Sequence, residues 1–302
     1  MIVVIGSINM DLVLGVPRMP MPGETISGGP FATIAGGKGA NQAVACARLA
    51  AGRVPVAMVG CVGDDGFGDT LRTALQDEGI DDSHVSTIAA TATGVASILV
   101  DAAGQNSIVL AAGANALLSP AHIDAARELI AAASIVVLQL EVPLETVGHA
   151  IKLAHSLGKT VLLNPAPARS LPAELLAQVD YLVPNEIEAA MLLGADAQGG
   201  AVVAAQTAQL LALGCRNVLV TLGAEGVYAA DAGGGHYYPA RQVKAVDSTA
   251  AGDTFIGGLV AALATGATLE QAIALGQRAA AISVTRRGAQ TSIPYLHELD
   301  AA

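Results

Sequence analysis

The sequence predicts an α/β protein with a central, mostly parallel β-sheet flanked by helices and a small antiparallel β lid. Short runs rich in valine and isoleucine alternate along the chain with alanine- and leucine-rich segments of helical period. Two segments, 12–35 and 93–111, break this alternation and have the pattern of short strands joined by turns. We therefore expect one domain over residues 1–302, into which both segments are inserted as the lid.

The expected strands are apolar along their whole length, as strands covered by helices on both faces are. They occupy residues 2–5, 54–59, 135–140, 160–163, 181–183, 218–221 and 227–229. The expected helices show apolar residues at three- and four-residue spacing, and several of them stop at a glycine. They occupy residues 41–51, 67–78, 120–133, 144–157, 186–193, 202–213, 253–264 and 269–285.

The two inserted segments are expected to form one small sheet. The first should contain short strands around residues 12–14 and 24–28, joined by a stretch rich in proline and glycine. The second has the pattern of a hairpin, with strands at 95–100 and 107–110 and a turn near 101–105.

Composition excludes several classes of protein. Of the 302 residues, 53% are apolar and 14% are charged, so the chain is neither disordered nor fibrous. Its net charge of −11 argues against a nucleic acid partner, because clustered lysine and arginine supply most of that affinity. No uncharged stretch is apolar enough for a membrane span. The three distant cysteines predict neither a disulfide framework nor a zinc site, and a cytoplasmic protein is expected.

Several common catalytic motifs are absent from the sequence. There is no P-loop and no G-x-S-x-G, and no G-x-G-x-x-G follows the first expected strand. The histidines show no metal-ligand spacing. These absences disfavour a P-loop nucleotide site, an α/β-hydrolase nucleophile and a dinucleotide-binding fold.

Polar residues follow the first expected strand, in the sequence GSINMD at residues 6–11. Ligands of open α/β sheets bind beyond the carboxyl ends of the strands. Asn9 and Asp11 are two residues apart, so in an extended chain their side chains point the same way and suit two sugar hydroxyls. An Asx turn explains the pair equally well.

A glycine-rich stretch, GGKGANQ at residues 36–42, leads into the first expected helix. Three glycines in four residues let backbone approach a ligand closely, and Lys38 adds a donor. A tight loop capped by Asn41 is the alternative. Glu141 ends the apolar run 135–140 and is placed to accept a hydroxyl, although its position alone favours a solvated glutamate at the sheet edge.

The stretch DSTAAGDTF at residues 247–255 carries the strongest signal. The expected helix start leaves the backbone N–H groups of Ala250, Ala251 and Gly252 free, and free N–H groups with the helix dipole bind anions. A carboxylate beside an anion site suits phosphoryl transfer, in which it accepts the proton of the attacking hydroxyl. The alternative is that Asp253 only caps its helix.

Two further stretches suggest a nucleotide. Asn185 opens a helix after a strand and is placed to meet phosphate, while Glu188 is placed to hold a water of Mg²⁺. A capped, acidic helix start is the alternative. Gly223 and Gly226 follow Thr221 in a turn against whose backbone a nucleotide could lie, and a simple hairpin turn explains them equally well.

Together these residues resemble the ribokinase family of carbohydrate kinases, and the resemblance covers the whole chain in order. Residues 36–44 and 247–255 are similar to the family's two signatures, and Asn185-x-x-Glu188 is similar to its magnesium and phosphate motif. The resemblance implies ATP-dependent phosphorylation of D-ribose at its 5-hydroxyl, with Mg²⁺ accompanying ATP. The family's widespread Gly-Ala-Gly-Asp is Ala-Ala-Gly-Asp here, which leaves a backbone anion site intact.

The resemblance also implies a role for each matching residue. Asp253 is the base, and Glu188 helps to place Mg²⁺. The implied sugar-binding residues are Asn9, Asp11, Gly37, Lys38, Gly39, Asn41, Glu141 and Asp253. The implied nucleotide-binding residues are Asn185, Thr221, Gly223, Gly226, Gly252 and Gln277. The implied site for an activating K⁺ comprises Asp247, Thr249, Ser283, Arg286, Gly288 and Ser292. The lid strands imply a homodimer, in which each lid edge is covered by its partner.

Two alternatives remain open at this point. The first is a kinase of the same family for 2-deoxyribose, a ketohexose or a nucleoside. Met10, between Asn9 and Asp11, makes deoxyribose the nearest of these. The second is a catalytically idle sugar-binding or regulatory protein on the same fold, against which Asp253 and the intact glycine loop argue.

Overall fold

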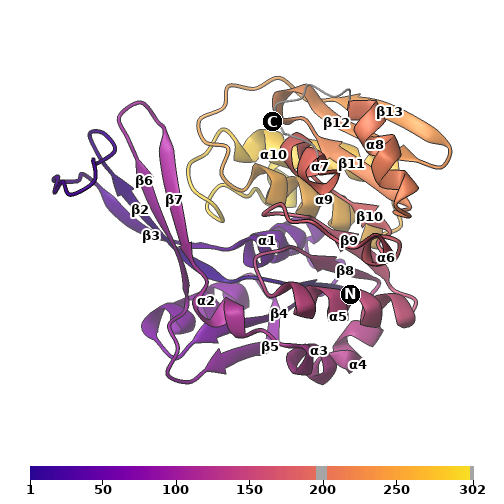
Figure 1. Cartoon of the computed structure of the whole chain (residues 1–302), viewed down its shortest axis with the longest axis horizontal. Helices are drawn as coiled ribbons and strands as arrows, with labels where there is room; N and C mark the ends of the chain where they lie inside the picture. Colours follow the sequence, from indigo (N-terminus) through magenta and orange to yellow (C-terminus); the bar gives the residue numbers. More distant parts are fainter. Residues whose placement is uncertain (195–202, 300–302) are drawn as a thin grey trace.

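The computed structural model describes residues 1–194 and 203–299. A nine-stranded sheet runs through the molecule (Figure 1). Its strands are, in spatial order, β13 (Gly234–Pro239), β12 (Gly226–Asp231), β11 (Asn217–Thr221), β10 (Tyr181–Leu182), β9 (Thr160–Leu163), β8 (Ile135–Leu138), β1 (Ile2–Ile5), β4 (Val56–Gly63) and β5 (Asp81–Ile88). All pairs from β11 to β5 are parallel, and only β12 and β13 run antiparallel to their neighbours.

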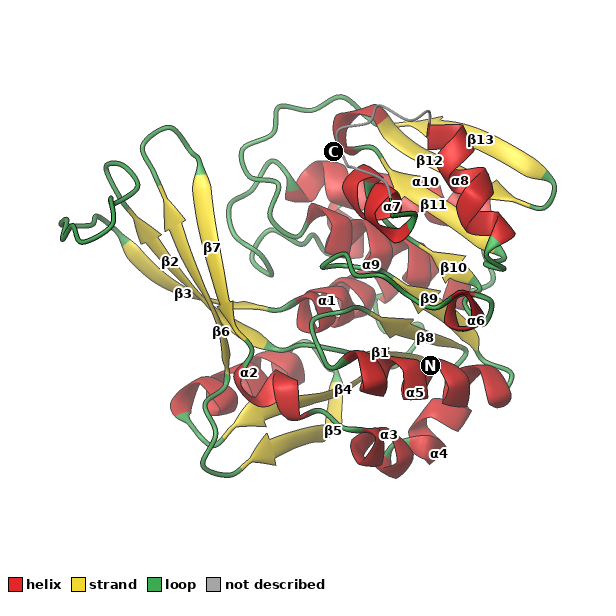
Figure 2. Ribbon diagram, viewed as in Figure 1, coloured by secondary structure: helices red, strands yellow, loops and turns green. Residues whose placement is uncertain are grey.

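Helices cover both faces of this sheet, as Figure 2 shows. Alternate residues of each strand point to opposite faces, so the apolar runs supply two separate cores. One face packs against α1 (Lys38–Ala50), α2 (Gly66–Asp77), α9 (Ala251–Ala264) and α10 (Leu269–Ser283). The other packs against α3 (Pro120–Ala125), α4 (Arg127–Ala132), α5 (Leu144–Ser156), α6 (Ala173–Leu176), α7 (Glu186–Leu192) and α8 (Val203–Ala212). The predicted α/β class, with helices flanking a mostly parallel sheet, is confirmed.

The helix bounds differ from the predictions at several places, and the short helix α6 was not predicted. The helix expected at 120–133 is divided in two at Ala126, whose φ of −91° and ψ of 9° leave the α region. Three helices begin before their predicted starts, α1 at Lys38, α2 at Gly66 and α9 at Ala251. Residue 202, the predicted start of the helix 202–213, lies outside the described residues.

The four-stranded sheet projects from one side of the molecule (Figures 1 and 2). Its strands are, in spatial order, β3 (Phe31–Gly36), β2 (Asn9–Gly15), β6 (Gly94–Val100) and β7 (Asn106–Ala111). Its two outer pairs are antiparallel, whereas β2 and β6 are parallel. The predicted strands 12–14, 95–100 and 107–110 lie within β2, β6 and β7.

The prediction of a strand around residues 24–28 was wrong. No strand forms there, and the second strand of that segment is β3. Prolines at 20, 22 and 30 lack the N–H that a ladder needs, and pairing with β2 begins only at Gly29, whose N–H donates to the carbonyl of Gly15 at 2.7 Å. Two strands were missed altogether. β5 alternates polar and apolar residues at one edge of the large sheet, and β13 begins with glycines at the other. In residues 1–194 and 203–299, no helix combines the length and the apolar content of a membrane span.

Candidate active site

The site lies where the carboxyl ends of the inner strands face the first turn of α9. A cavity of about 200 Å³ opens there. Its lining includes Lys38, Asn164, Asn185, Glu188, Thr221, Gly252 and Asp253. Asn164, Asn185 and Thr221 come together because the carboxyl ends of parallel strands lie at one edge of the sheet. The other four residues are brought in by the first turns of α1, α7 and α9.

Asp253 is the third residue of α9, and its side chain is 6% exposed. Ala250, with a φ of 58°, is the N-cap, so the alternative of Asp253 as a helix cap was wrong. Instead its carboxylate accepts hydrogen bonds from two side-chain amides. Asn41 Nδ2 donates to Oδ2 at 3.0 Å, and Gln42 Nε2 donates to Oδ1 at 2.9 Å. Two donors from α1 thus hold this carboxylate at the cavity wall.

A network of buried amides extends from Asp253 and was not assigned from the sequence. Gln139 Nε2 donates to Gln42 Oε1 at 2.6 Å, and Gln42 Nε2 lies 3.2 Å from Asn164 Oδ1. Asn164 Nδ2 in turn donates to the carbonyl of Val183 at 2.9 Å. Gln139 interrupts the apolar run 135–140, and a polar residue in a fully buried strand was the available signal.

Asn9 and Asp11 lie on β2, on the same face, as the two-residue spacing predicted. Asn115, in the short 3₁₀ helix Gly113–Leu117, positions Asn9: its Nδ2 donates to Asn9 Oδ1 at 2.7 Å. Asn115 also bonds the backbone of Ile8 in both directions, at 2.9 and 3.1 Å. The Asx-turn alternative does not apply, because both residues are in extended strand.

Asp11 is almost completely buried beside other acids. Burial raises the pKa of its carboxyl to about 7, and the charges of Glu141 and Asp253 raise it further in the same direction. The backbone of Gly36 passes next to this carboxyl, since a Cβ there would lie 2.3 Å from Asp11 Oδ2. Near neutral pH, Asp11 therefore exchanges between its neutral and charged forms.

Asp11→Asn is expected to change how stability depends on pH. The unfolded Asp11 titrates near 3.8 and the folded one near 7, so the native state binds the extra proton between these values. Wild-type stability therefore falls as pH rises through this window, by up to about 1.4 kcal/mol per pH unit. The variant lacks this loss, so its stability relative to wild type grows from pH 4 to 7. Urea unfolding at four pH values measures it, and parallel curves would contradict the assignment.

The glycine loop fits closely against the chain that follows β1. Gly37, the N-cap of α1, has a φ of 88°, and a Cβ there would lie 2.7 Å from the amide nitrogen of Asn9. A Cβ on Gly39 would lie 2.7 Å from the amide nitrogen of Ser7. Asn41 is inside α1 and is therefore not its cap. The glycines allow this close approach, which brings the start of α1 to Asn9.

Glu141 contacts the glycine loop at Lys38, the first residue of α1. Glu141 Oε2 accepts the Ser7 hydroxyl at 2.6 Å and the backbone N–H of Lys38 at 3.1 Å, so this partly exposed carboxylate is bonded within the site and is not only a solvated edge residue. Burial alone would lower the pKa of the Lys38 ammonium, but the carboxylates of Asp253, Glu141 and Glu188 outweigh it and raise the pKa. Lys38 is therefore a charged donor among three carboxylates.

Two of the nucleotide candidates lie at the helix start that follows β10. Asn185 and Glu188 form a reciprocal capping box at the start of α7, with both hydrogen bonds 2.8 Å long, so the capping alternative is correct as far as it goes. Both residues also line the cavity. Burial raises the pKa of Glu188, the Asn185 N–H and Lys38 lower it, and the net shift is upward.

The structure differs from the sequence-based expectations at the start of α9 and at Gln277. The Ala251 N–H donates to the Ser248 carbonyl at 3.2 Å and is not free. Within the described residues, the N–H groups of Ala250 and Gly252 have no acceptor. Gln277 Nε2 donates to the carbonyl of Tyr238 at 2.8 Å, and Gln277 does not line the cavity.

The six residues expected around a monovalent cation come from three segments that meet. Asp247 joins two of them: its carboxylate accepts the N–H and hydroxyl of Thr249 at 2.9 and 2.6 Å, and the Gly288 N–H at 2.9 Å. Burial would raise the pKa of Asp247, yet these hydrogen bonds lower it overall. Ser283 and Ser292 are fully buried nearby.

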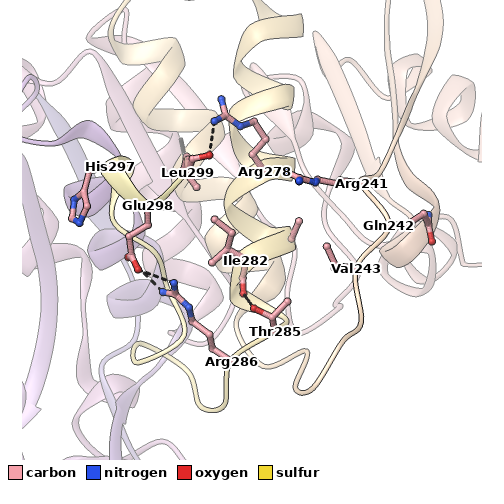
Figure 3. Close-up of a pocket in the computed structure, with 11 residues that line it drawn as sticks. Arg241, Gln242, Val243, Arg278, Ile282, Thr285, Arg286, His297, Glu298 and Leu299 are labelled. Carbon is pink, nitrogen blue, oxygen red and sulfur yellow. Dashed lines mark hydrogen bonds and ion pairs between the residues drawn. The ribbon is translucent and has the colours of Figure 1, made fainter. Parts of the chain in front are cut away.

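The charge of Arg286 is directed at Glu298. Its Nη2 lies 2.7 Å from Glu298 Oε1, as Figure 3 shows. The figure is centred on a larger cavity of about 540 Å³ between α10 and the C-terminal segment. That cavity shares no lining residue with the cavity at Asp253. Among the residues of 1–194 and 203–299, no cluster of three His, Cys, Asp or Glu could hold a metal.

The family model for the pfkB family of carbohydrate kinases matches residues 1–296. The chain belongs to this family. Among curated pfkB-family relatives, ribokinase of Haemophilus influenzae is 44% identical over 98% of this chain and 95% of its own. Deoxyribokinase of Salmonella typhimurium is 40% identical over 99% of this chain and 97% of its own.

Solved structures of pfkB-family proteins superpose over almost the whole chain. Ribokinase from Thermotoga maritima gives a TM-score of 0.92 at 38% identity, covering 100% of this chain and 98% of that one. Arabidopsis thaliana ribokinase complexed with ribose and ATP gives 0.92 at 33% identity, covering 99% and 97%. The resemblance inferred from the two signature stretches is thus confirmed.

Proposed function

We propose that this chain is an ATP-dependent kinase that phosphorylates D-ribose at its 5-hydroxyl, giving D-ribose 5-phosphate and ADP. The observation that carries the proposal is Asp253, a buried carboxylate held by two amides. It lies beside the N–H groups of Ala250 and Gly252, which have no acceptor among the described residues. The relatives named ribokinase, 40–44% identical over nearly the whole chain, support the choice of sugar.

The reaction follows from this arrangement. Asp253 accepts the proton of the 5-hydroxyl as its oxygen forms the bond to the γ-phosphorus, and the bond from that phosphorus to the bridging oxygen of ADP breaks. The N–H groups of Ala250 and Gly252, at the positive end of α9, hold the negative charge of the transferring group. Lys38, which lines the same cavity, adds a positive charge.

The sugar would lie over the glycine loop. Asn9, Asp11 and Glu141 offer acceptors for its hydroxyls, and the backbone of Gly37 and Gly39 allows close approach. Asn41 donates to Asp253 Oδ2 and keeps its own oxygen free of any partner in the described residues. That oxygen is buried, and a buried acceptor needs a partner, which a sugar hydroxyl would supply.

ATP would lie along Asn185, Thr221 and the glycines at 223 and 226. Mg²⁺ would shield the phosphate charges. Glu188 would face it from the protein, and the remaining ligands would be phosphate oxygens and water. The second carboxylate oxygen of Glu188 accepts no hydrogen bond within the described residues, and it is therefore free to accept from such a water.

We also propose that an activating K⁺ binds between residues 247–249 and the loop 286–292, here called the cation loop. Asp247 joins these two segments through its bond to the Gly288 N–H. The donor set fits this ion, because Asp247 supplies one charge and the rest are carbonyl oxygens. In the part of the chain that the structure describes, the carbonyls of Thr249, Arg286, Gly288 and Ser292 accept no hydrogen bond. Arg286 contributes only its backbone, because its guanidinium pairs with Glu298.

A single assay tests the proposed activity. ADP release is measured with D-ribose, 2-deoxyribose, a ketohexose and a nucleoside, in KCl and in NaCl at equal ionic strength. We expect the highest kcat/KM with D-ribose and a several-fold higher rate in KCl. A higher kcat/KM with 2-deoxyribose would replace the proposed sugar, and no ADP release with any acceptor would favour the idle binding protein. Equal rates in both salts would overturn the cation proposal alone.

We further propose that the four-stranded sheet is a lid inserted in a single domain, and that it pairs two chains into a homodimer. Its edge strand β7 is exposed along its whole length, and the apolar side chains of Ile108, Val109 and Leu110 are all on it. Phe31, on the opposite edge strand β3, is 60% exposed. Exposed apolar edges of this kind call for a covering partner, which a second lid supplies.

Val109→Lys is expected to dissociate this dimer. Val109 is 68% exposed in the chain, so the lysine leaves the monomer folded but places a charge in the proposed interface. Met191→Lys, at an exposed methionine of α7 remote from the lid, is the matched control. Sedimentation at micromolar concentration should give a dimer for wild type and the control, and a monomer for Val109→Lys. A monomeric wild type contradicts the proposal.

A further inference from the structure

Arg48 ties the C-terminal segment to the helix of the glycine loop. It lies in the last turn of α1, and its side chain is 13% exposed. Its Nη1 donates to two backbone carbonyls, those of Gln290 at 2.8 Å and Ile293 at 2.7 Å. These two carbonyls flank Ser292. A single planar guanidinium thus fixes the backbone on both sides of Ser292, which is one of the six residues expected around the cation.

The guanidinium is itself held from two further directions. Its Nε donates to Glu78 Oε1 at 3.0 Å, and its Nη2 pairs with the same carboxylate, which is 15% exposed. The ring of Tyr295 covers its face, with 4.6 Å from the guanidinium carbon to the ring centroid. An arginine with all these contacts has little rotational freedom left, so it holds the segment in one place.

The same segment is tied at its far end to α10. Arg286 pairs with Glu298, and Arg278 donates to the carbonyl of Leu299 at 2.8 Å (Figure 3). The loop that carries Gly288 and Ser292 is therefore fixed on both sides. Arg48 is the contact that comes from the helix of the sugar site, whose other end holds Asp253 through Asn41 and Gln42.

We propose that Arg48, held by Glu78, is a positioning residue for the carbonyl oxygens of the cation loop. The inference rests on the cation part of the proposed function. Carbonyls that are already held in the binding geometry bind a cation without the cost of ordering the loop. Removing a residue that orients the ligands of a metal typically changes the affinity for that metal by about 10- to 100-fold. The same contact joins cation binding to α1 and so to the residues that hold Asp253.

The test compares Arg48→Met with a matched control, Arg72→Met. Arg72 also binds one backbone carbonyl, that of Val85 at 2.6 Å, and one carboxylate, that of Asp82 at 2.9 Å, but it lies between α2 and β5. The rise in Tm is titrated with KCl, with NaCl keeping the ionic strength constant. Hydrogen exchange of residues 288–293 is measured without K⁺. Arg48→Lys, a milder change, replaces Arg48→Met if the latter does not fold.

In Arg48→Met, the KCl concentration that produces a given small rise in Tm should increase by about tenfold or more, and exchange in 288–293 should speed up. Arg72→Met should lower Tm but leave both quantities at the wild-type level. Arg48→Lys should give an intermediate value, because one ammonium cannot reach both carbonyls and Glu78. An unchanged KCl titration in Arg48→Met, with a K⁺-responsive wild type, overturns the role of Arg48 alone. A wild type without any K⁺ response overturns the cation site and this inference together. The kinase activity is then still tested separately by the ADP-release assay.

Discussion

Asp253→Asn should lower kcat by about 10²- to 10⁴-fold, which is the contribution of a general base. An amide cannot accept the proton of the 5-hydroxyl, so the barrier rises by roughly 3–5.5 kcal/mol. ATP affinity should change little or improve slightly, because a negative charge near the phosphates is removed. Steady-state rates with D-ribose and ATP give kcat, and a binding titration gives the nucleotide affinity.

The fold should tolerate this change, for a reason that the hydrogen bonds make specific. The new amide keeps one acceptor for Gln42 and turns a donor toward Asn41. Asn41 Oδ1 has no partner within the described residues, so Asn41 can rotate its amide and accept that hydrogen bond. Tm should therefore stay within a few degrees of wild type.

Asp81→Asn is the matched control, because Asp81 is an exposed strand residue that accepts the Ser83 N–H at 2.9 Å. Its kcat should equal that of wild type. If Asp253→Asn keeps more than about a tenth of wild-type kcat, the loss falls below the range of a general base. The base would then have to be sought elsewhere, with Asp11 and Glu141 the next carboxylates in line.

Gly37→Ala should damage both stability and sugar binding. Gly37 has a φ of 88°, which an alanine adopts at a cost of about 1–3 kcal/mol. Its Cβ would also lie 2.7 Å from the amide nitrogen of Asn9 and 3.0 Å from the carbonyl of Ser7, so the loop must move away from β2. Because Asn9 and the loop bind the sugar together in our proposal, KM for D-ribose should rise about tenfold or more, since a displacement near 1 Å can cost about 10²-fold.

Gly66→Ala separates this effect from glycine replacement in general. Gly66 begins α2, and a Cβ there would meet nothing within 4 Å. Its stability should change by less than about 1 kcal/mol and its KM should be unchanged. Chemical unfolding and ribose titrations measure both variants. A Gly37→Ala protein with wild-type KM would remove the glycine loop from the sugar site.

Local sequence determined the inner part of the fold. Strands β1 and β9 begin and end at the predicted residues, because a strand buried on both faces is a nearly continuous apolar run that stands out in the sequence. Edge strands carry no such requirement. β5 is half-exposed and β13 is glycine-rich, and both form because a neighbouring strand offers its hydrogen bonds. Single-sequence patterns do not contain that information.

For the site, the sequence by itself determined which residue types were available: the glycine loop, Asp253, and the pair Asn185 and Glu188. Whether Asp253 caps a helix or faces a ligand was decided only by the tertiary structure. Ala250 adopts a positive φ, α9 therefore starts two residues before Asp253, and α1 supplies the two amides that hold its carboxylate. These contacts join residues more than 200 positions apart. The backbone geometry of a helix start and the packing of two distant helices are properties of the folded chain, so no local pattern could have distinguished the two roles.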